Sequence, residues 1–348
     1  MYDILLKWCL LLATLTLTQE QTLDNLGPLN VDRSPLTISG FSSGGNMAQQ
    51  MQVAYSSCFN GSAAFASVPY HCGVDNYINY RVLCNLGFRG VNDFVRDARK
   101  FQSEGKIDSL SNLRNQRHYH YVPQYDTLVA WNIRTRSNTG EFFKAVGMNS
   151  RNIEIVIGNK SDHWMPTDNI NLPSCTNSIG RKIGANTTAV SFCQYKGALE
   201  GLRFLYKDQA SLSSPDATTM LQPLREFSQS KFLAEADAKF LDSIGYLYIP
   251  TNCVNGEKRC KFHVAMHGCR GSRSAVGSSF VKESGYLEVA EKNDIVMIFP
   301  QSIPFKGNPD GCWDCFDASG PDAATKTGKQ MRALMSMIKT VTEIQGCL

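Results

Sequence analysis

Ser42 lies at the centre of the motif Gly40-Phe-Ser-Ser-Gly44, which separates a β-favouring run from a helix-favouring run. A strand, Gly-x-Ser-x-Gly and a helix form the pattern of a nucleophile elbow, in which a tight turn lifts the serine clear of the sheet. Glycines suit this turn because a Cβ would clash with the neighbouring strand or helix. The pattern predicts that Ser42 is a nucleophile at a helix N-terminus, where free N–H groups stabilise negative charge. The alternative is a Gly/Ser-rich turn without chemistry.

A serine hydroxyl needs a base to take its proton, and the base needs a carboxylate to orient it. In α/β-hydrolases these residues come in the order Ser, Asp or Glu, His, and each follows a strand. Asp126 follows the predicted strand 118–122, and His163 follows the predicted strand 153–157. The sequence therefore predicts a triad of Ser42, Asp126 and His163.

The other histidines are weaker candidates for the base. His118 and His120 share one face of a predicted strand, where such residues are usually packed, and no third ligand suggests that they form a metal site. His71 and His263 have no loop setting that suits a base. His267 lies just past a predicted strand and is the main alternative to His163.

Two further acidic residues are alternatives to Asp126 as the carboxylate of the triad. Asp162 is the immediate neighbour of His163 and would need a strained geometry to reach that ring. Asp168 is a candidate for the cap of a turn.

These residues need a scaffold, and the sequence alternates short apolar β-rich runs with amphipathic runs. Several predicted strands are apolar throughout, which is typical of strands covered on both faces. This alternation predicts an α/β fold with a mostly parallel sheet flanked by helices on both faces, and ligands beyond the carboxyl ends of the strands. The predicted strands are 36–39, 63–68, 118–122, 153–157, 245–249, 262–266 and 295–299. The predicted helices are 46–55, 92–101, 140–146, 196–206, 275–292 and 329–341, while residues 207–238 are less regular.

The nucleophile comes early in the chain, so only one predicted strand precedes it. An ordinary α/β-hydrolase builds several strands first and supplies an oxyanion donor from a turn upstream of the serine. Here a comparable turn, His267-Gly-Cys-Arg-Gly-Ser272, follows the strand 262–266 far downstream. The sequence therefore predicts a circularly permuted α/β-hydrolase, which is feasible because domain termini often lie near each other at the surface.

The composition of the chain is typical of a folded protein. Among 348 residues, 43% are hydrophobic and 19% are charged. The 35 basic and 31 acidic residues are mixed along the sequence, with a net charge of +4. Because no basic block stands out, we expect no nucleic-acid partner.

Residues 1–18 resemble a secretory signal, with Lys7 followed by an apolar run. The run is too short to span a bilayer, and a polar segment follows it directly. The alternative is a buried N-terminal helix. We expect a signal peptide over residues 1–18, a single catalytic domain over residues 19–348, and no membrane span.

Cysteines and sequons agree with export. The chain has 12 cysteines, and secreted proteins can keep disulfides. Asn-x-Ser/Thr sequons make Asn60, Asn159 and Asn186 candidates for glycosylation. We therefore expect an extracellular protein.

Several short motifs follow one another in a specific order along the chain. They are Ser39-Gly-Phe-Ser-Ser-Gly-Gly45, Tyr125-Asp-Thr-Leu-Val129, His163-Trp-Met-Pro-Thr-Asp168, Gly245-Tyr-Leu-Tyr-Ile-Pro250, His263-Val-Ala-Met-His-Gly-Cys269, Asn308-Pro-Asp-Gly-Cys-Trp-Asp314 and Lys326-Thr-Gly-Lys-Gln-Met331. In these motifs and their order, the chain resembles secreted poly(3-hydroxybutyrate) depolymerases of the single-domain, circularly permuted α/β-hydrolase type. The resemblance extends from about Pro35 to Ile338.

The resemblance implies roles for residues around the triad. It implies an oxyanion hole made by the backbone N–H groups of Ser43 and Cys269, with His267 shaping the turn. It also implies that Trp313 lines the pocket for the acyl chain. Trp164 stands where the family usually has a smaller residue after the base, and we expect it to help shape the same pocket.

Loop positions and the resemblance also imply disulfides. The expected pairs are Cys72–Cys84, Cys175–Cys193, Cys253–Cys260 and Cys269–Cys312, the last of which ties the oxyanion turn to the pocket loop. Spacing cannot assign the remaining Cys58, Cys315 and Cys347.

We expect a monomeric secreted serine esterase that uses neither a metal nor an organic cofactor. Its expected substrate is poly(3-hydroxybutyrate) or short hydroxyalkanoate oligomers. One alternative is a carboxylesterase for small acyl, acetyl-sugar or feruloyl esters, with a narrower pocket. The other is a catalytically silent secreted binding protein on a hydrolase scaffold.

Overall fold

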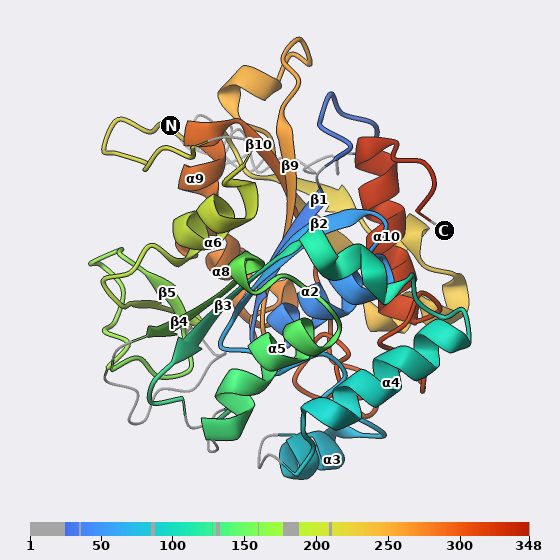
Figure 1. Cartoon of the computed structure of the whole chain (residues 1–348). Coiled ribbons are helices and arrows are strands. Elements are labelled where there is room, and N and C mark those ends of the chain that lie inside the picture. Colours follow the sequence, from blue (N-terminus) through green and yellow to red (C-terminus); the bar gives the residue numbers. More distant parts are fainter. Residues whose placement is uncertain are drawn as a thin grey trace, which may run out of the picture.

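The computed structural model describes residues 25–34, 36–84, 88–126, 128–129, 133–158, 160–176, 188–208 and 211–347. The predicted signal peptide over residues 1–18 lies outside the described residues. The chain is shown in Figure 1.

Eight strands form the main sheet of the described residues. Six neighbours in a row, from β4 to β10, are parallel, and β8 and β7 continue the sheet in antiparallel pairs. In spatial order, the strands are β4 (Ile153–Gly158), β3 (Arg117–Pro123), β2 (Phe59–Phe65), β1 (Leu36–Phe41), β9 (Lys261–Met266), β10 (Ile295–Phe299), β8 (Ile244–Tyr248) and β7 (Arg225–Ser228). A second sheet pairs β5 (Met165–Thr167) with β6 (Val190–Phe192).

The order of the strands shows the permutation. One half of the sheet holds β1 to β4, and the other half holds β7 to β10. The halves join where β1, the first strand of the chain, pairs in parallel with β9. The strands that an ordinary α/β-hydrolase builds before its nucleophile therefore follow it here, as the position of the His267 turn predicted.

Helices cover both faces of the sheet (Figure 1). One face packs against α2 (Ser43–Ala54), α4 (Val91–Ser103), α5 (Ile133–Ala145) and α10 (Lys329–Thr342). The other face packs against α6 (Gly197–Tyr206), α8 (Ser279–Glu283) and α9 (Tyr286–Asn293). Short helical segments make up the rest: α3 (Tyr77–Asn79), η1 (Tyr80–Cys84), η2 (Leu110–Asn115), η3 (Ser150–Asn152), η4 (Ser230–Phe232), η5 (Glu235–Phe240), η6 (Thr251–Cys253) and α7 (Arg273–Val276).

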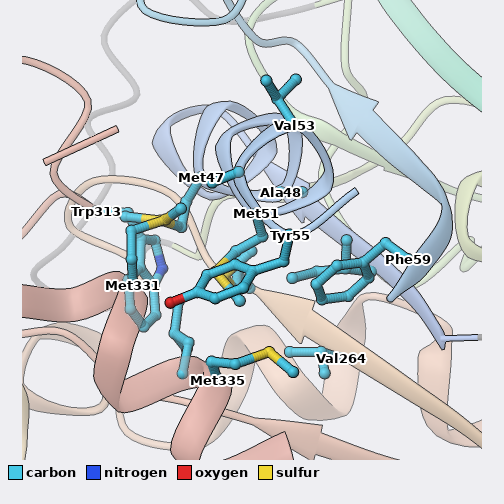
Figure 2. Close-up of a cluster of buried hydrophobic side chains, with 14 of the residues drawn as sticks. Met47, Ala48, Met51, Val53, Tyr55, Phe59, Val264, Trp313, Met331 and Met335 are labelled. Atoms are coloured by element: carbon cyan, nitrogen blue, oxygen red, sulfur yellow. The ribbon is translucent and has the colours of Figure 1, made fainter. Parts of the chain in front are cut away.

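The larger hydrophobic cluster lies between the sheet, α2 and α10. Figure 2 shows Met47 and Met51 of α2 facing Met331 and Met335 of α10, with Val264 of β9 beside them. Unbranched methionines fill irregular gaps well, so they suit the space between two helices and a sheet. This packing holds α2, the helix that follows Ser42, against the body of the fold.

Each predicted strand falls on a strand of the main sheet, and the predicted fold class is confirmed. The single helix predicted over 275–292 is wrong, because the structure has three short helices there. Gly277 and Gly285 have φ values of 60° and 81°, a left-handed backbone that a continuous helix cannot contain. The irregular segment 207–238 also contributes an edge strand, β7.

Four disulfides are present in the described residues. Three are the expected pairs Cys72–Cys84, Cys253–Cys260 and Cys269–Cys312. The fourth, Cys58–Cys347, joins two cysteines that spacing could not assign and ties the C-terminus to the end of α2. Cys315 is a buried thiol.

The expected pair Cys175–Cys193 is not bonded in this structure. The two thiols lie side by side in a hydrogen bond. Backbone hydrogen bonds from Cys175 N–H to Phe192 O and from Cys193 N–H to Thr167 O hold both segments in register. The structure brings together the two cysteines that the resemblance paired, but the expected disulfide is not formed in it.

Of the predicted glycosylation sites, only Asn60 lies in the described residues. It is partly buried at the start of β2, where the ladder to β1 skips a residue. Asn159 and Asn186 lie outside the described residues. In the part of the chain that the structure describes, no helix combines the length and apolarity that crossing a membrane requires.

Candidate active site

Ser42 sits in a sharp turn between β1 and α2. Its backbone has φ 53° and ψ −120°, a conformation that a non-glycine residue adopts only where the surroundings impose it. A Cβ on Gly40 would lie 2.3 Å from the backbone of Gly44, and a Cβ on Gly44 would lie 2.3 Å from His267 O. The glycines of the motif are therefore required by close backbone contacts, and they leave Ser42 projecting at the carboxyl edge of the sheet.

Asp126 follows β3 and is held by its own loop. One carboxylate oxygen, Oδ1, accepts hydrogen bonds from the backbone N–H groups of Leu128 and Val129, each at 2.9 Å. The other oxygen, Oδ2, lies 2.7 Å from Nδ1 of His163. The hydrogen bonds to the loop backbone thus orient the Asp126 carboxylate so that Oδ2 faces His163.

His163 bridges the acid and the serine. Its Nε2 atom lies 2.9 Å from Ser42 Oγ, while Nδ1 contacts Asp126. Because a carboxylate can only accept, Nδ1 carries the proton and Nε2 accepts from the serine hydroxyl. The backbone N–H of His163 donates to Asp162 Oδ1 at 2.7 Å, so Asp162 supports the loop rather than the ring. The three predicted side chains therefore lie within hydrogen-bond reach of each other.

The three side chains are nearly enclosed. Ser42 is 8% exposed, Asp126 3% and His163 5%. The ring of Phe41 covers His163, with 5.0 Å between the ring centroids. Exclusion of water strengthens charge interactions, so an imidazolium formed here would be stabilised by Asp126 more than at a surface.

A turn after β9 approaches the serine from the other half of the chain. A Cβ on Gly268 would lie 2.9 Å from Ser42 Cβ, so the turn packs directly against the elbow. Among the described residues, the backbone N–H groups of Ser43 and Cys269 have no hydrogen-bond acceptor. The Cys269–Cys312 disulfide anchors the turn to the loop that carries Trp313. Two free donors beside a nucleophile form the arrangement that stabilises an oxyanion.

His267 is hydrogen-bonded to the backbone of this turn. The backbone N–H of Ser302 donates to its Nε2 atom at 3.2 Å, so the ring proton is on Nδ1, which donates to Gly268 O at 2.7 Å. Burial lowers the pKa of His267 to about 4, so the ring is neutral. Both ring nitrogens of His267 are therefore occupied by backbone groups.

The two tryptophans expected in the substrate pocket are almost fully buried. Trp313 is 0% exposed, its backbone N–H donates to Ser43 Oγ at 3.2 Å, and its ring lies 5.5 Å from that of His267. Figure 2 shows the indole beside Met47 and Met331. Trp164 is 3% exposed. Both lie near the candidate site, but little of either ring is accessible in this state.

The remaining candidates lie elsewhere. His71 bonds Asp97 at 3.0 Å, and Asp168 pairs with Lys196 at 3.6 Å on the surface. His118 and His120 are buried in β3. Within the described ranges, no group of three or more His, Cys, Asp or Glu side chains could hold a metal ion.

Asp314 is a residue that sequence reasoning missed. Its carboxylate accepts hydrogen bonds from the backbone N–H groups of Phe316, Ala318 and Ser319, and it is 1% exposed. It therefore shapes the loop that carries Trp313. The motif Cys312-Trp-Asp314 was visible in the sequence. The hydrogen-bond partners of Asp314, however, are main-chain N–H groups, which a pattern of side chains does not reveal.

The chain was compared with known proteins, and no protein-family model matches it. It is similar to the "Polyhydroxybutyrate depolymerase" of Talaromyces funiculosus, with 32% identity over 332 residues that cover 91% of this chain and 92% of the relative. It is also 29% identical to the "Poly(3-hydroxybutyrate) depolymerase" of Delftia acidovorans, over 92% of this chain and 62% of that relative.

Solved structures give the same result. The chain is similar to the crystal structure of PHB depolymerase from Penicillium funiculosum, with a TM-score of 0.81, 30% identity, and coverage of 92% of this chain and 99% of that one. It is also similar to a serine-to-alanine variant of PHB depolymerase complexed with an R3HB trimer, with a TM-score of 0.79, 30% identity and the same coverage.

Proposed function

The chain belongs to the polyhydroxybutyrate depolymerase family and is a hydrolase of ester bonds, and we propose that it cleaves poly(3-hydroxybutyrate) and its short oligomers through Ser42, His163 and Asp126. The observation that carries this proposal is the position of the His163 ring, 2.7 Å from Asp126 and 2.9 Å from Ser42.

In the first half of the reaction, Ser42 Oγ attacks the ester carbonyl carbon while His163 Nε2 takes the hydroxyl proton. Asp126 holds the ring in the Nδ1-protonated form and stabilises its charge. The carbonyl oxygen becomes an oxyanion, which accepts hydrogen bonds from the N–H groups of Ser43 and Cys269. The tetrahedral intermediate then collapses, the bond between the carbonyl carbon and the leaving oxygen breaks, and His163 gives its proton to that alkoxide oxygen, which leaves as a hydroxyl group.

In the second half of the reaction, a water molecule enters the position that the leaving alcohol has vacated and hydrolyses the acyl-enzyme. His163 takes a proton from the water as its oxygen attacks the acyl-enzyme, and the same two N–H groups stabilise the second oxyanion. Collapse breaks the bond to Ser42 Oγ, and His163 returns the proton to the serine. The products are an acid and a hydroxyl-ended oligomer, and the enzyme is restored.

A polymer substrate is supported by apolar side chains beside the site. Tyr125 and Leu128, which flank Asp126, are 55% and 42% exposed, and Ile157 at the end of β4 is 54% exposed. Exposed apolar side chains of this kind suit contact with a polyester surface.

Secretion and a monomeric state are further parts of the proposal. Four disulfides in the described residues suit an oxidising compartment outside the cytosol. Sedimentation of the purified protein and amino-terminal sequencing of the exported form test these two points.

The proposed reaction is tested by product release from poly(3-hydroxybutyrate) film and from an R3HB trimer. We expect 3-hydroxybutyrate units from both, and a loss of about 10⁴-fold or more in Ser42→Ala. Ser56→Ala, two residues beyond the end of α2, is a matched control that should keep full activity. Equal turnover by Ser42→Ala rejects the proposed nucleophile. Cleavage of small acyl esters without release from film or trimer favours a carboxylesterase, and no labelling of Ser42 by a fluorophosphonate favours a silent scaffold.

A further inference from the structure

A row of five buried polar side chains crosses the two strands that lead to the candidate active site. It runs from Tyr286 of α9 through Ser39 of β1, His263 of β9 and Thr37 of β1 to Tyr206 of α6, and each member is at most 1% exposed. The successive distances are 2.5 Å from Tyr286 OH to Ser39 Oγ, 2.7 Å from Ser39 Oγ to His263 Nε2, 2.8 Å from His263 Nδ1 to Thr37 Oγ1 and 2.8 Å from Thr37 Oγ1 to Tyr206 OH.

The end of the row determines where each proton lies. Tyr206 OH donates to the carbonyl oxygen of Phe262 at 2.8 Å, and a carbonyl can only accept. Because that bond uses the single proton of Tyr206, the hydroxyl of Thr37 must donate to Tyr206. Thr37 Oγ1 then accepts from His263, so Nδ1 of His263 carries a proton.

The other side of the ring follows from its charge. His263 is fully buried, and none of its hydrogen-bond partners among the described residues is a carboxylate. Burial lowers its pKa to about 3, so the ring is neutral. Nε2 therefore accepts from the hydroxyl of Ser39, and Ser39 Oγ accepts from Tyr286. Every proton in the row points the same way, from α9 to α6.

His263 joins strands that carry different parts of the candidate site. Thr37 lies opposite His263 in the ladder, and Ser39 lies opposite Ala265. Thr37 and Ser39 share one face of β1, so the ring contacts two residues of the neighbouring strand at once. A slip of one residue would turn that face of β1 away from the ring. These two hydrogen bonds are therefore possible only in the observed register.

We propose that His263 is a positioning residue for ester hydrolysis: its ring locks β1 against β9 and thereby sets the Ser42 hydroxyl relative to the N–H group of Cys269. β1 ends directly before Ser42, and β9 ends three residues before Cys269. The inference rests on the proposed roles of Ser42 and Cys269. Misplacement of a reacting group by about 1 Å can cost about 100-fold in rate, so a small shift between the two strands is expected to lower kcat.

The chain provides a matched control for this role. Ser62 of β2 is as buried as Ser39, and its Oγ lies 2.9 Å from Nδ1 of another buried histidine, His118. Ser39→Ala and Ser62→Ala each remove one hydroxyl from a buried histidine. Of these two serines, Ser39 is the one whose histidine partner joins the strand before Ser42 to the strand before Cys269.

The first test compares these variants on p-nitrophenyl butyrate and on an R3HB trimer. We expect Ser39→Ala to lower kcat by about 10- to 100-fold with KM nearly unchanged, and Ser62→Ala to keep kcat within about threefold at a similar loss of melting temperature. Thr37→Val replaces Ser39→Ala in the comparison if the latter does not fold. A kcat for Ser39→Ala within threefold of the natural protein overturns the proposal, as does an equal loss in Ser62→Ala.

The second test uses the natural protein and depends on no variant. Nitrogen-15 NMR of labelled histidine should show His263 protonated at Nδ1 and unchanged from pH 5 to pH 9. A proton on Nε2, or titration within this range, contradicts the proton order and the proposed lock. An inactive natural protein would instead reject the proposed function, so the two failures are distinguishable.

Discussion

Gly268 packs against Ser42 so closely that a Cβ on Gly268 would lie 2.9 Å from the serine Cβ. The same Cβ would lie 2.7 Å from the ring of Phe41. The contact joins the turn after β9 to the elbow after β1, and Cys269 and Ser43 are the residues that directly follow Gly268 and Ser42. Position 268 therefore has no room for a side chain.

Gly268→Ala is expected to lower kcat by about 100- to 1,000-fold, the loss typical of one missing oxyanion donor, because the turn must move away from Ser42. Steady-state kinetics on a soluble ester measure this. Gly27→Ala is the control, since a Cβ there meets only an ordinary contact at 3.8 Å. A variant with full kcat would mean that the Cys269 amide is not a donor.

Asp126→Asn is expected to lower kcat by about 10⁴-fold, because an amide no longer favours the ring form with its proton on Nδ1. The neighbouring Asp162→Asn is the matched control. An Asn oxygen can still accept the bond from the His163 backbone N–H, so this variant should stay within a few-fold of the natural rate. If the two variants lost activity equally, the proposed role of Asp126 would be wrong.

Asp317 is expected to make stability depend on pH. Burial raises its pKa to about 6, with Asp314 and Asp75 also raising it and His71 opposing them. The folded state therefore binds the proton more tightly than the unfolded state, and the cost of ionising this buried group is fully present above pH 6 and fades as pH falls toward 4.

Asp317→Asn removes that cost. We expect it to raise the free energy of unfolding by about 1–3 kcal/mol at pH 7.5 and by less at pH 4.5. Urea denaturation at both pH values measures the difference. A gain that grows at the lower pH would contradict the assigned direction.

Two disulfides are expected to have different effects when both cysteines of a pair become serine. Loss of Cys58–Cys347 should lower stability by about 2–4 kcal/mol and leave kcat of the folded protein unchanged, because it ties only the C-terminus to α2. Loss of Cys269–Cys312 should also lower kcat, because it frees the oxyanion turn. Thermal unfolding and ester kinetics on both variants test this, and an unchanged kcat in the second would show that the turn holds its position alone.

Local patterns in the sequence were enough to predict the strand–turn–helix setting of Ser42 and the positions of Asp126 and His163 after two strands. Those signals are local, since a strand, a tight glycine turn and a helix each depend on a few neighbouring residues. The downstream His267 turn also predicted the permutation. The break of 275–292 into short helices was missed because helical periodicity does not register two glycines that adopt positive φ.

How the two halves of the chain meet became visible in the folded structure and not in the sequence. The side chains of Thr37 and Ser39 are ordinary β-strand residues in the sequence, yet they bond His263 from 226 and 224 positions away. The contact between Gly268 and Ser42 and the disulfide between Cys58 and Cys347 also join residues that are far apart in the sequence. These contacts depend on which strands become neighbours in the sheet, and no local pattern encodes that choice because it results from packing the whole chain.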